Sequence, residues 1–222
     1  MKNNDIKIAI KENGVIVIVR GVRGDNLIKL FDALLKGGIT MAEITFGKFS
    51  DEETCSDLKE IVEKFGSRML VGAGTVTTYE RAQYAVKAGV KYIVSPVSDK
   101  KVIERAKEKG LGVISGAFTP TEIKNAYDLG ADVVKLFPAN ALGPKYIKSI
   151  RQPLSDIPLI CFGGININNV CDYLDAGACA VGVGADIVNM EMIEKGDFEG
   201  ISLKAENFVN KVKKVINGVN IR

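Results

Sequence analysis

The feature that most constrains the fold of this chain is a repeated join between a helical stretch and a short apolar run, with glycine at the join. Glycine is favoured just after the last helical residue, because it adopts the left-handed backbone conformation at little cost. The joins are Lys36-Gly37, Ala88-Gly89, Lys109-Gly110, Leu129-Gly130 and Ala176-Gly177. The chain is therefore predicted to alternate helices with strands.

The apolar runs predict eight strands, and the stretches between them have the spacing of amphipathic helices. The predicted strands are 15–20, 41–45, 69–73, 92–95, 112–115, 132–137, 158–162 and 179–183. The predicted helices are 6–13, 26–36, 50–65, 78–89, 99–109, 119–130, one after Gly143-Pro144, 166–177 and 202–216. This alternation predicts an α/β fold, a single (β/α)8 TIM barrel with a short N-terminal helix, in one domain over residues 1–222. A doubly wound open sheet is the alternative.

The clearest helix start is a capping box, in which a residue before the helix and one three residues later each bond the other's backbone. Thr119 and Glu122 have this spacing, and Pro120 occupies the first helical position, where its missing N–H costs little. We also expect Asn166 to cap the helix that ends at Gly177.

The charge balance excludes some classes of partner. The chain has 30 Lys and Arg against 27 Asp and Glu, and the net charge of +3 is too small to indicate binding to nucleic acid or a membrane surface. The lysine-rich stretch 99–109 fits the solvent-exposed face of an amphipathic helix. No apolar run has the length of a membrane span, and the first residues lack the pattern of a signal peptide.

The reactive side chains narrow the chemistry further. The chain has no histidine, which excludes a Ser-His or Cys-His nucleophile and a histidine-rich zinc site. Acid–base work then falls to Glu, Asp, Lys, Tyr, Thr or water, and we expect neither a metal nor another cofactor. The cysteines form no Cys-x-x-Cys pair, so we expect reduced thiols in a cytoplasmic protein. They are Cys55, Cys161, Cys171 and Cys179.

Lys135 lies in the middle of the apolar run Asp132-Val-Val-Lys-Leu-Phe-Pro138, which predicts a buried strand. Burial of an ammonium group without a partner is costly, so a buried lysine is driven towards its neutral form. A neutral amine is a nucleophile, and Lys135 is our candidate for a Schiff base with a carbonyl substrate. The alternative is that its stem lines the core while its amine reaches solvent.

In a TIM barrel the active site lies at the carboxyl ends of the strands. If Glu43 and Lys135 both occupy inward-facing positions of their strands, they meet inside the barrel. Such a pair fits a Schiff-base lysine with its acid–base partner, and it also fits a structural ion pair. Arg20 ends the first predicted strand, where it either binds a substrate carboxylate or is a surface cation.

Two glycine stretches follow the last two predicted strands. Loops at these places in a TIM barrel often bind phosphate through backbone N–H groups. The alternative is that the glycines only make tight turns. The residues expected to contact substrate are Gly163, Gly164, Gly184 and Ala185.

Six short motifs resemble, in order, those of the 2-keto-3-deoxy-6-phosphogluconate / 4-hydroxy-2-oxoglutarate aldolase family, over nearly the whole chain. They are Glu43-Ile-Thr45, Val71-Gly-Ala-Gly-Thr-Val76, Ser95-Pro96, Val134-Lys-Leu-Phe-Pro-Ala139, Gly163-Gly-Ile165 and Val181-Gly-Val-Gly184. Members of this family are class I aldolases, lyases of carbohydrate metabolism that cleave a 2-keto-3-deoxy acid or its phosphate to pyruvate and an aldehyde. The resemblance implies the same reaction here.

The resemblance also implies roles for individual residues. By it, Lys135 is the Schiff-base lysine and Glu43 the general acid/base. Thr75, Pro96 and Phe137 match positions that line the pocket. It further implies a homotrimer without a metal cofactor.

Three positions depart from the family pattern. Many members have Arg where this chain has Gly47, Thr where it has Phe162, and Ser where it has Ala185. The first of these contacts the substrate carboxylate in those members, a role that passes to Arg20 here. The other two help to hold substrate or phosphate, so an unphosphorylated substrate is an alternative. Two further alternatives are a phosphosugar epimerase that uses the lysine and glutamate as acid and base, and a barrel that only binds a small acid.

Overall fold

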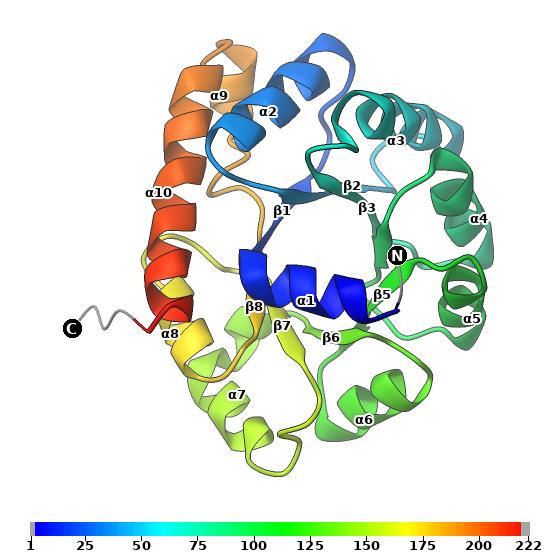
Figure 1. Cartoon of the computed structure of the whole chain (residues 1–222), viewed down its shortest axis with the longest axis vertical. Helices are drawn as coiled ribbons and strands as arrows, with labels where there is room; N and C mark the ends of the chain where they lie inside the picture. The colour runs from blue at the N-terminus through cyan, green and yellow to red at the C-terminus, as the bar shows by residue number, and fades with distance from the viewer. Residues whose placement is uncertain (1–2, 219–222) are drawn as a thin grey trace.

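The computed structural model describes residues 3–218, in which eight parallel strands close into a barrel in chain order (Figure 1). The strands are β1 (Val15–Val19), β2 (Met41–Thr45), β3 (Leu70–Gly74), β4 (Tyr92–Val94), β5 (Gly112–Ala117), β6 (Val133–Leu136), β7 (Leu159–Phe162) and β8 (Ala180–Val183). Pairing of β8 with β1 completes the ring. The predicted TIM barrel is confirmed, and the open-sheet alternative is wrong.

Helices surround this barrel (Figure 1). They are α2 (Gly24–Lys36), α3 (Asp51–Phe65), α4 (Tyr79–Ala88), α5 (Lys100–Glu108), α6 (Pro120–Asp128), α7 (Gly143–Arg151), α8 (Val170–Asp175), α9 (Met190–Glu194) and α10 (Phe198–Ile216), with a short 3-10 helix, η1 (Ala139–Ala141), before α7. Within residues 3–218, no helix combines the length and the apolar character needed to cross a membrane.

One further helix, α1 (Asn3–Asn13), crosses the opening of the barrel (Figure 1). Its Ile6 and Ile10 are buried in the cluster of side chains that fills the barrel interior. Ile6 packs against Gly112, the first residue of β5, where an added Cβ atom would lie 2.6 Å from it. The helix α1 therefore closes the amino-terminal end of the barrel and leaves the carboxyl end open for a site.

Glycines that face the barrel axis make room for large aromatic side chains. The ring of Tyr92 lies over Gly72, where a Cβ atom would come within 2.3 Å of it. The ring of Phe162 lies equally close over Gly182, at 2.3 Å from an added Cβ atom. Both rings are fully buried, so the barrel interior is packed rather than hollow.

Several helix starts differ from the prediction, and two of these differences have a clear local cause. Asn166 does not cap the helix that follows β7: it caps an isolated turn, with its side chain bonded to the Asn168 N–H at 2.9 Å, and α8 begins only at Val170. The last helix, α10, begins at Phe198 rather than near residue 202, because the Asp197 side chain caps it there. Both errors come from short-range side-chain bonds that decide where a helix begins.

A buried ion pair anchors the start of β6. The Asp132 carboxylate is 4% exposed and accepts hydrogen bonds from Lys107 Nζ at 2.8 and 2.9 Å and from the Val113 N–H at 2.8 Å. We expect Asp132→Ala to lower the free energy of unfolding by about 3 kcal/mol, because it leaves a partly buried ammonium and a buried N–H without a partner. Urea unfolding measures this.

The matched control is Asp128→Ala, which breaks the exposed pair between Asp128 and Lys124 on α6. Exposed pairs of this kind contribute little, so the change should stay below about 0.5 kcal/mol. Equal losses in the two variants would show that burial of the Asp132 pair does not matter.

Candidate active site

The side chain of Lys135 lies on the inward face of β6 and is 7% exposed. Its Nζ lies 5.0 Å from the centroid of the Phe137 ring and 4.3 Å from that of the Phe162 ring. Burial lowers the pKa of Lys135, while the Glu43 carboxyl group raises it and Arg20 lowers it. The amine is therefore closer to its neutral, nucleophilic form than an exposed lysine would be.

Glu43 lies on the inward face of β2 and is 1% exposed, with its carboxyl group packed over Gly74. Burial raises the pKa of Glu43 to about 7, and the positive charges of Lys135 and Arg20 oppose that rise. The structure thus brings these three groups close enough for their charges to interact. A carboxyl group with this pKa gains and loses a proton near neutral pH, as an acid–base catalyst must.

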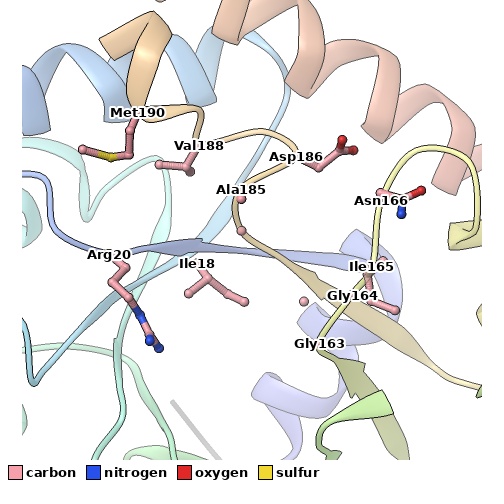
Figure 2. Close-up of a pocket in the computed structure, with 12 residues that line it drawn as sticks. Ile18, Arg20, Gly163, Gly164, Ile165, Asn166, Ala185, Asp186, Val188 and Met190 are labelled. Atoms are coloured by element: carbon pink, nitrogen blue, oxygen red, sulfur yellow. The ribbon is translucent and has the colours of Figure 1, made fainter. Parts of the chain in front are cut away.

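A cavity of about 650 Å³ opens at the carboxyl end of the barrel (Figure 2). Its size is typical of sites that bind small molecules. In Figure 2, Arg20 lies on one side of Ile18, and Asn166 and Asp186 lie on the other. The lining residues are Ile18, Arg20, Gly163, Gly164, Ile165, Asn166, Gly182, Gly184, Ala185, Asp186, Val188 and Met190.

The Phe162 ring connects this cavity with Lys135. It packs on Gly182, which lines the cavity, and its face lies 4.3 Å from the Lys135 amine. Neither Lys135 nor Glu43 belongs to the cavity lining. The lysine and the glutamate therefore lie beside the cavity, inside the barrel. Arg20 links the two regions, because it lines the cavity and its charge interacts with those of Lys135 and Glu43.

The other residues predicted from the sequence fall into two sets. One set lines the cavity together with Arg20, and its members are Gly163, Gly164, Gly184 and Ala185. Thr75, Pro96 and Phe137 do not line it. They follow β3, β4 and β6 at the same end of the barrel, and Phe137 is 40% exposed with its ring near the Lys135 amine.

Thr75 has an unusual backbone conformation. Its φ is 58°, and within residues 3–218 it is the one non-glycine residue with a positive φ. This conformation is costly for a β-branched residue, so the surrounding structure must hold it. Its carbonyl accepts a hydrogen bond from Arg81 Nη1 at 3.3 Å, and the next N–H, of Val76, bonds the Val94 carbonyl at 3.1 Å. Strain of this kind is typical of functional sites, and this one lies where β3 ends.

Some residues of the site were not predicted from the sequence. They also line the cavity and are Ile18, Ile165, Asn166, Asp186, Val188 and Met190. Most follow the two glycine stretches after β7 and β8 within a few positions, and this proximity is the signal that was available. Asn166 was interpreted only as a helix cap.

Tyr92 was also missed, because its strand looks like ordinary core in the sequence. Its hydroxyl is buried, and no described group bonds it; the same holds for Glu43 Oε2 and Thr45 Oγ1. Burial and, to a smaller extent, the negative charge of Glu43 raise the pKa of Tyr92 well above its usual value. The surroundings of the Glu43 carboxyl group therefore include a neutral phenol.

Two of the four cysteines carry unreactive thiols. All four are free, and burial raises the pKa of Cys179 to about 11 and that of Cys161 still further. Such thiols are protonated at neutral pH and react slowly. Among the residues that the structure describes, no group of three or more Cys, Asp or Glu side chains is placed to hold a metal ion.

The sequence matches the family model of the KDPG and KHG aldolases over residues 6–203. It is 34% identical to the 2-dehydro-3-deoxy-6-phosphogalactonate aldolase of Escherichia coli K12 over 174 residues, which cover 78% of this chain and 83% of that protein. It is 32% identical to the 2-dehydro-3-deoxy-phosphogluconate aldolase of Treponema pallidum over 195 residues, which cover 87% of this chain and 91% of that protein.

Comparison with solved structures gives the same result as the sequence comparison. The native KDPGal structure matches with a TM-score of 0.83 and 31% identity, covering 91% of this chain and 96% of that one. The KDPG aldolase of Legionella pneumophila, with pyruvate captured as a covalent carbinolamine intermediate, matches with a TM-score of 0.83 and 25% identity, covering 90% of this chain and 96% of that one. This chain therefore belongs to the KDPG and KHG aldolase family.

Proposed function

We propose that this protein is a class I aldolase that cleaves a 2-keto-3-deoxy acid to pyruvate and an aldehyde, with Lys135 as the Schiff-base lysine and Glu43 as its acid–base partner. The observation that carries the proposal is the buried Lys135 amine, whose pKa is lowered and whose charge interacts with that of Glu43. Family membership and the relative captured with covalently bound pyruvate support the same chemistry.

Cleavage begins at the C2 ketone of the keto acid. The neutral Nζ of Lys135 attacks this carbon to give a carbinolamine, which loses water to become an iminium. Glu43, as the carboxylate, takes the proton of the C4 hydroxyl through a bridging water. The C3–C4 bond then breaks, its electron pair moves into the iminium to form an enamine, and C4 leaves as the aldehyde.

The second half of the reaction releases pyruvate. The enamine takes a proton at C3, supplied by the Glu43 carboxyl group through the same water, and becomes the iminium of pyruvate. Water hydrolyses this iminium, which frees pyruvate and restores the Lys135 amine. Arg20 holds the substrate carboxylate, which fixes C2 against the amine.

The remaining residues form the walls of the site. We assign Thr75, Pro96 and Phe137 to the keto-acid end, near Lys135. We assign to the aldehyde end the residues of the last two loops, Gly163, Gly164, Gly184 and Ala185, which line the cavity together with Arg20.

Borohydride trapping with pyruvate tests the proposal. Borohydride reduces the iminium to a stable secondary amine, so the protein mass should rise by one reduced pyruvate, and peptide mapping should place the adduct on Lys135. A folded protein that gives no adduct beside a working control aldolase would contradict the proposal. An epimerase or a protein that only binds a small acid would then be the better reading.

The Phe162 ring should influence the pH dependence of adduct formation. Leucine at this position stays apolar and buried but has no π face, so Phe162→Leu loses one cation–π contact that stabilises the Lys135 ammonium. We expect the pKa of Lys135 to fall further below its usual value. The rate of trapping with pyruvate, measured against pH, reports this shift.

Phe208→Leu is the matched control, because Phe208 is fully buried in the outer core, on α10. It should lose comparable stability and leave the pH dependence unchanged. A shift of the same size in both variants would mean that the Phe162 ring has no specific contact with the amine.

We further propose that the enzyme is a cytoplasmic homotrimer that needs no metal ion or other cofactor. The family resemblance supports the trimer, and the free cysteines fit a reducing compartment. Light scattering after size-exclusion chromatography should give three times the mass of the chain, and activity should survive EDTA. A monomeric active enzyme or one that EDTA inactivates would contradict these two points.

A further inference from the structure

We propose that the aldehyde end of the substrate is an uncharged, hydroxylated chain rather than a phosphate ester, and that Asp186 sets this preference. The inference rests on the proposed aldolase function and concerns only which aldehyde is used. It separates this chain from the relatives described above, whose names specify phosphorylated substrates.

The Asp186 carboxylate is fixed between the two loops that form the aldehyde end. Asp186 follows β8, and its Oδ2 accepts a hydrogen bond from the Ile167 N–H, in the loop after β7, at 2.8 Å. Figure 2 shows Asp186 and Asn166 on the same side of the cavity, away from Arg20. Asp186 therefore occupies one backbone N–H of this end with a hydrogen bond, and its carboxylate places negative charge there.

The charges along the cavity favour one orientation of a keto acid. Among the lining residues, the charged side chains are those of Arg20 and Asp186, one on each side of Ile18. Arg20 interacts with the charges of Lys135 and Glu43, so it lies on the side where the substrate carboxylate must be held. The aldehyde end of the same substrate then lies on the side of Asp186.

A phosphate ester at the aldehyde end would meet like charge. Phosphate monoesters carry between one and two negative charges at neutral pH, and a carboxylate beside them repels them. The nearest lysine, Lys204 on α10, donates to the Asp186 carbonyl at 3.3 Å but does not line the cavity. Its charge offsets that of Asp186 only in part. The position where a serine hydroxyl would help to hold phosphate is Ala185.

The same groups suit hydroxyls. A carboxylate accepts hydrogen bonds from hydroxyl groups, and the Asp186 carboxylate has a second oxygen for this. Asn166 adds an amide: its Oδ1 accepts from the Asn168 N–H at 2.9 Å, which leaves Nδ2 to donate. The backbone N–H groups of the glycine stretches bind a hydroxyl oxygen as readily as a phosphate oxygen.

The test compares glyceraldehyde with glyceraldehyde 3-phosphate as partners of pyruvate in aldol addition. For the parent enzyme we expect kcat/KM to be higher with glyceraldehyde by at least about 10-fold. Asp186→Asn keeps the size of the side chain and removes its charge, so it should move this ratio towards the phosphate by about 10-fold or more. Asp175→Asn, the same change at an exposed position on α8, should leave the ratio unchanged.

Two outcomes would overturn the inference: a parent enzyme that prefers the phosphorylated aldehyde, or an Asp186→Asn variant with the parent's ratio. A measurement on the parent alone guards against a variant that does not fold: glycerol 3-phosphate should inhibit no better than glycerol, and stronger inhibition would also overturn the inference. Trapping with pyruvate needs no aldehyde. Its failure would therefore count against the aldolase function, and its success with the wrong aldehyde preference would count against the role of Asp186 alone.

Discussion

Replacement of Lys135 with methionine should lower the rate of aldol cleavage by at least about 10⁴-fold, because no other group supplies the covalent electron sink. Methionine has nearly the length of lysine and is apolar, which suits a side chain that is 7% exposed. The variant should fold, and borohydride with pyruvate should give no adduct. Steady-state kinetics and intact mass after trapping measure the two effects.

Two comparisons separate the loss of chemistry from a loss of fold. Lys145→Met makes the same change at an exposed position of α7 and should keep full activity and a full adduct. Urea unfolding should show Lys135→Met to be at least as stable as the parent, since it no longer buries an amine. An adduct that persists in Lys135→Met would move the Schiff base to another lysine.

Much of the fold could be predicted because local and global signals agree in this chain. The capping box of Thr119 and Glu122 begins α6 as expected, and Gly89, Gly110, Gly130 and Gly177 adopt positive φ where helices turn into strands. The alternation of strand and helix, repeated eight times, leaves few topologies open. Lys135 could be identified from the sequence because a charged residue conflicts with the apolar pattern of a buried strand, and such conflicts occur at functional sites.

Most contacts within the site could not be predicted, because they depend on how distant strands close. That Lys135 and Glu43 meet was predicted only on the condition that both side chains face the barrel axis, which the closed barrel makes possible. The contact of Phe162 with the Lys135 amine depends on the ring's packing over Gly182, and sequence spacing does not report this packing. Asp186 looked like an ordinary loop residue until its carboxylate was found on the Ile167 N–H.

The second large effect is expected for Glu43→Gln. Glutamine keeps the shape of the side chain but neither takes nor gives a proton, so kcat for cleavage should fall by about 10²–10⁴-fold. Pyruvate should still give one adduct on Lys135 under borohydride, although more slowly, because the amine is intact. Glu80→Gln, at an exposed position of α4, is the control and should be fully active.

The pH profile should identify Glu43 as the base. Its pKa is raised to about 7, so the carboxylate that accepts the C4 hydroxyl proton forms as pH rises through 7. Cleavage by the parent enzyme should therefore increase with pH through this range. In Glu43→Gln the residual rate of cleavage should no longer increase with pH in this range. If it still increases, the group that titrates is another residue.

The ionisation of Glu43 should also be visible in the stability of the parent protein, whose free energy of unfolding should fall as pH rises through 7. An exposed carboxylate, whose pKa is not raised, would not give this fall. The Glu43 carboxyl group has a pKa of about 7 in the folded state, against 4.5 when it is freely solvated, as in the unfolded chain. As pH rises from 4.5 through 7, the folded state keeps a proton that the unfolded state has lost, so the parent loses stability. Glu43→Gln has no such proton. Its free energy of unfolding should match the parent's near pH 4 and exceed it by about 3 kcal/mol near pH 8. A pH-independent difference in urea unfolding would mean that Glu43 ionises in the folded protein as freely as it does in water.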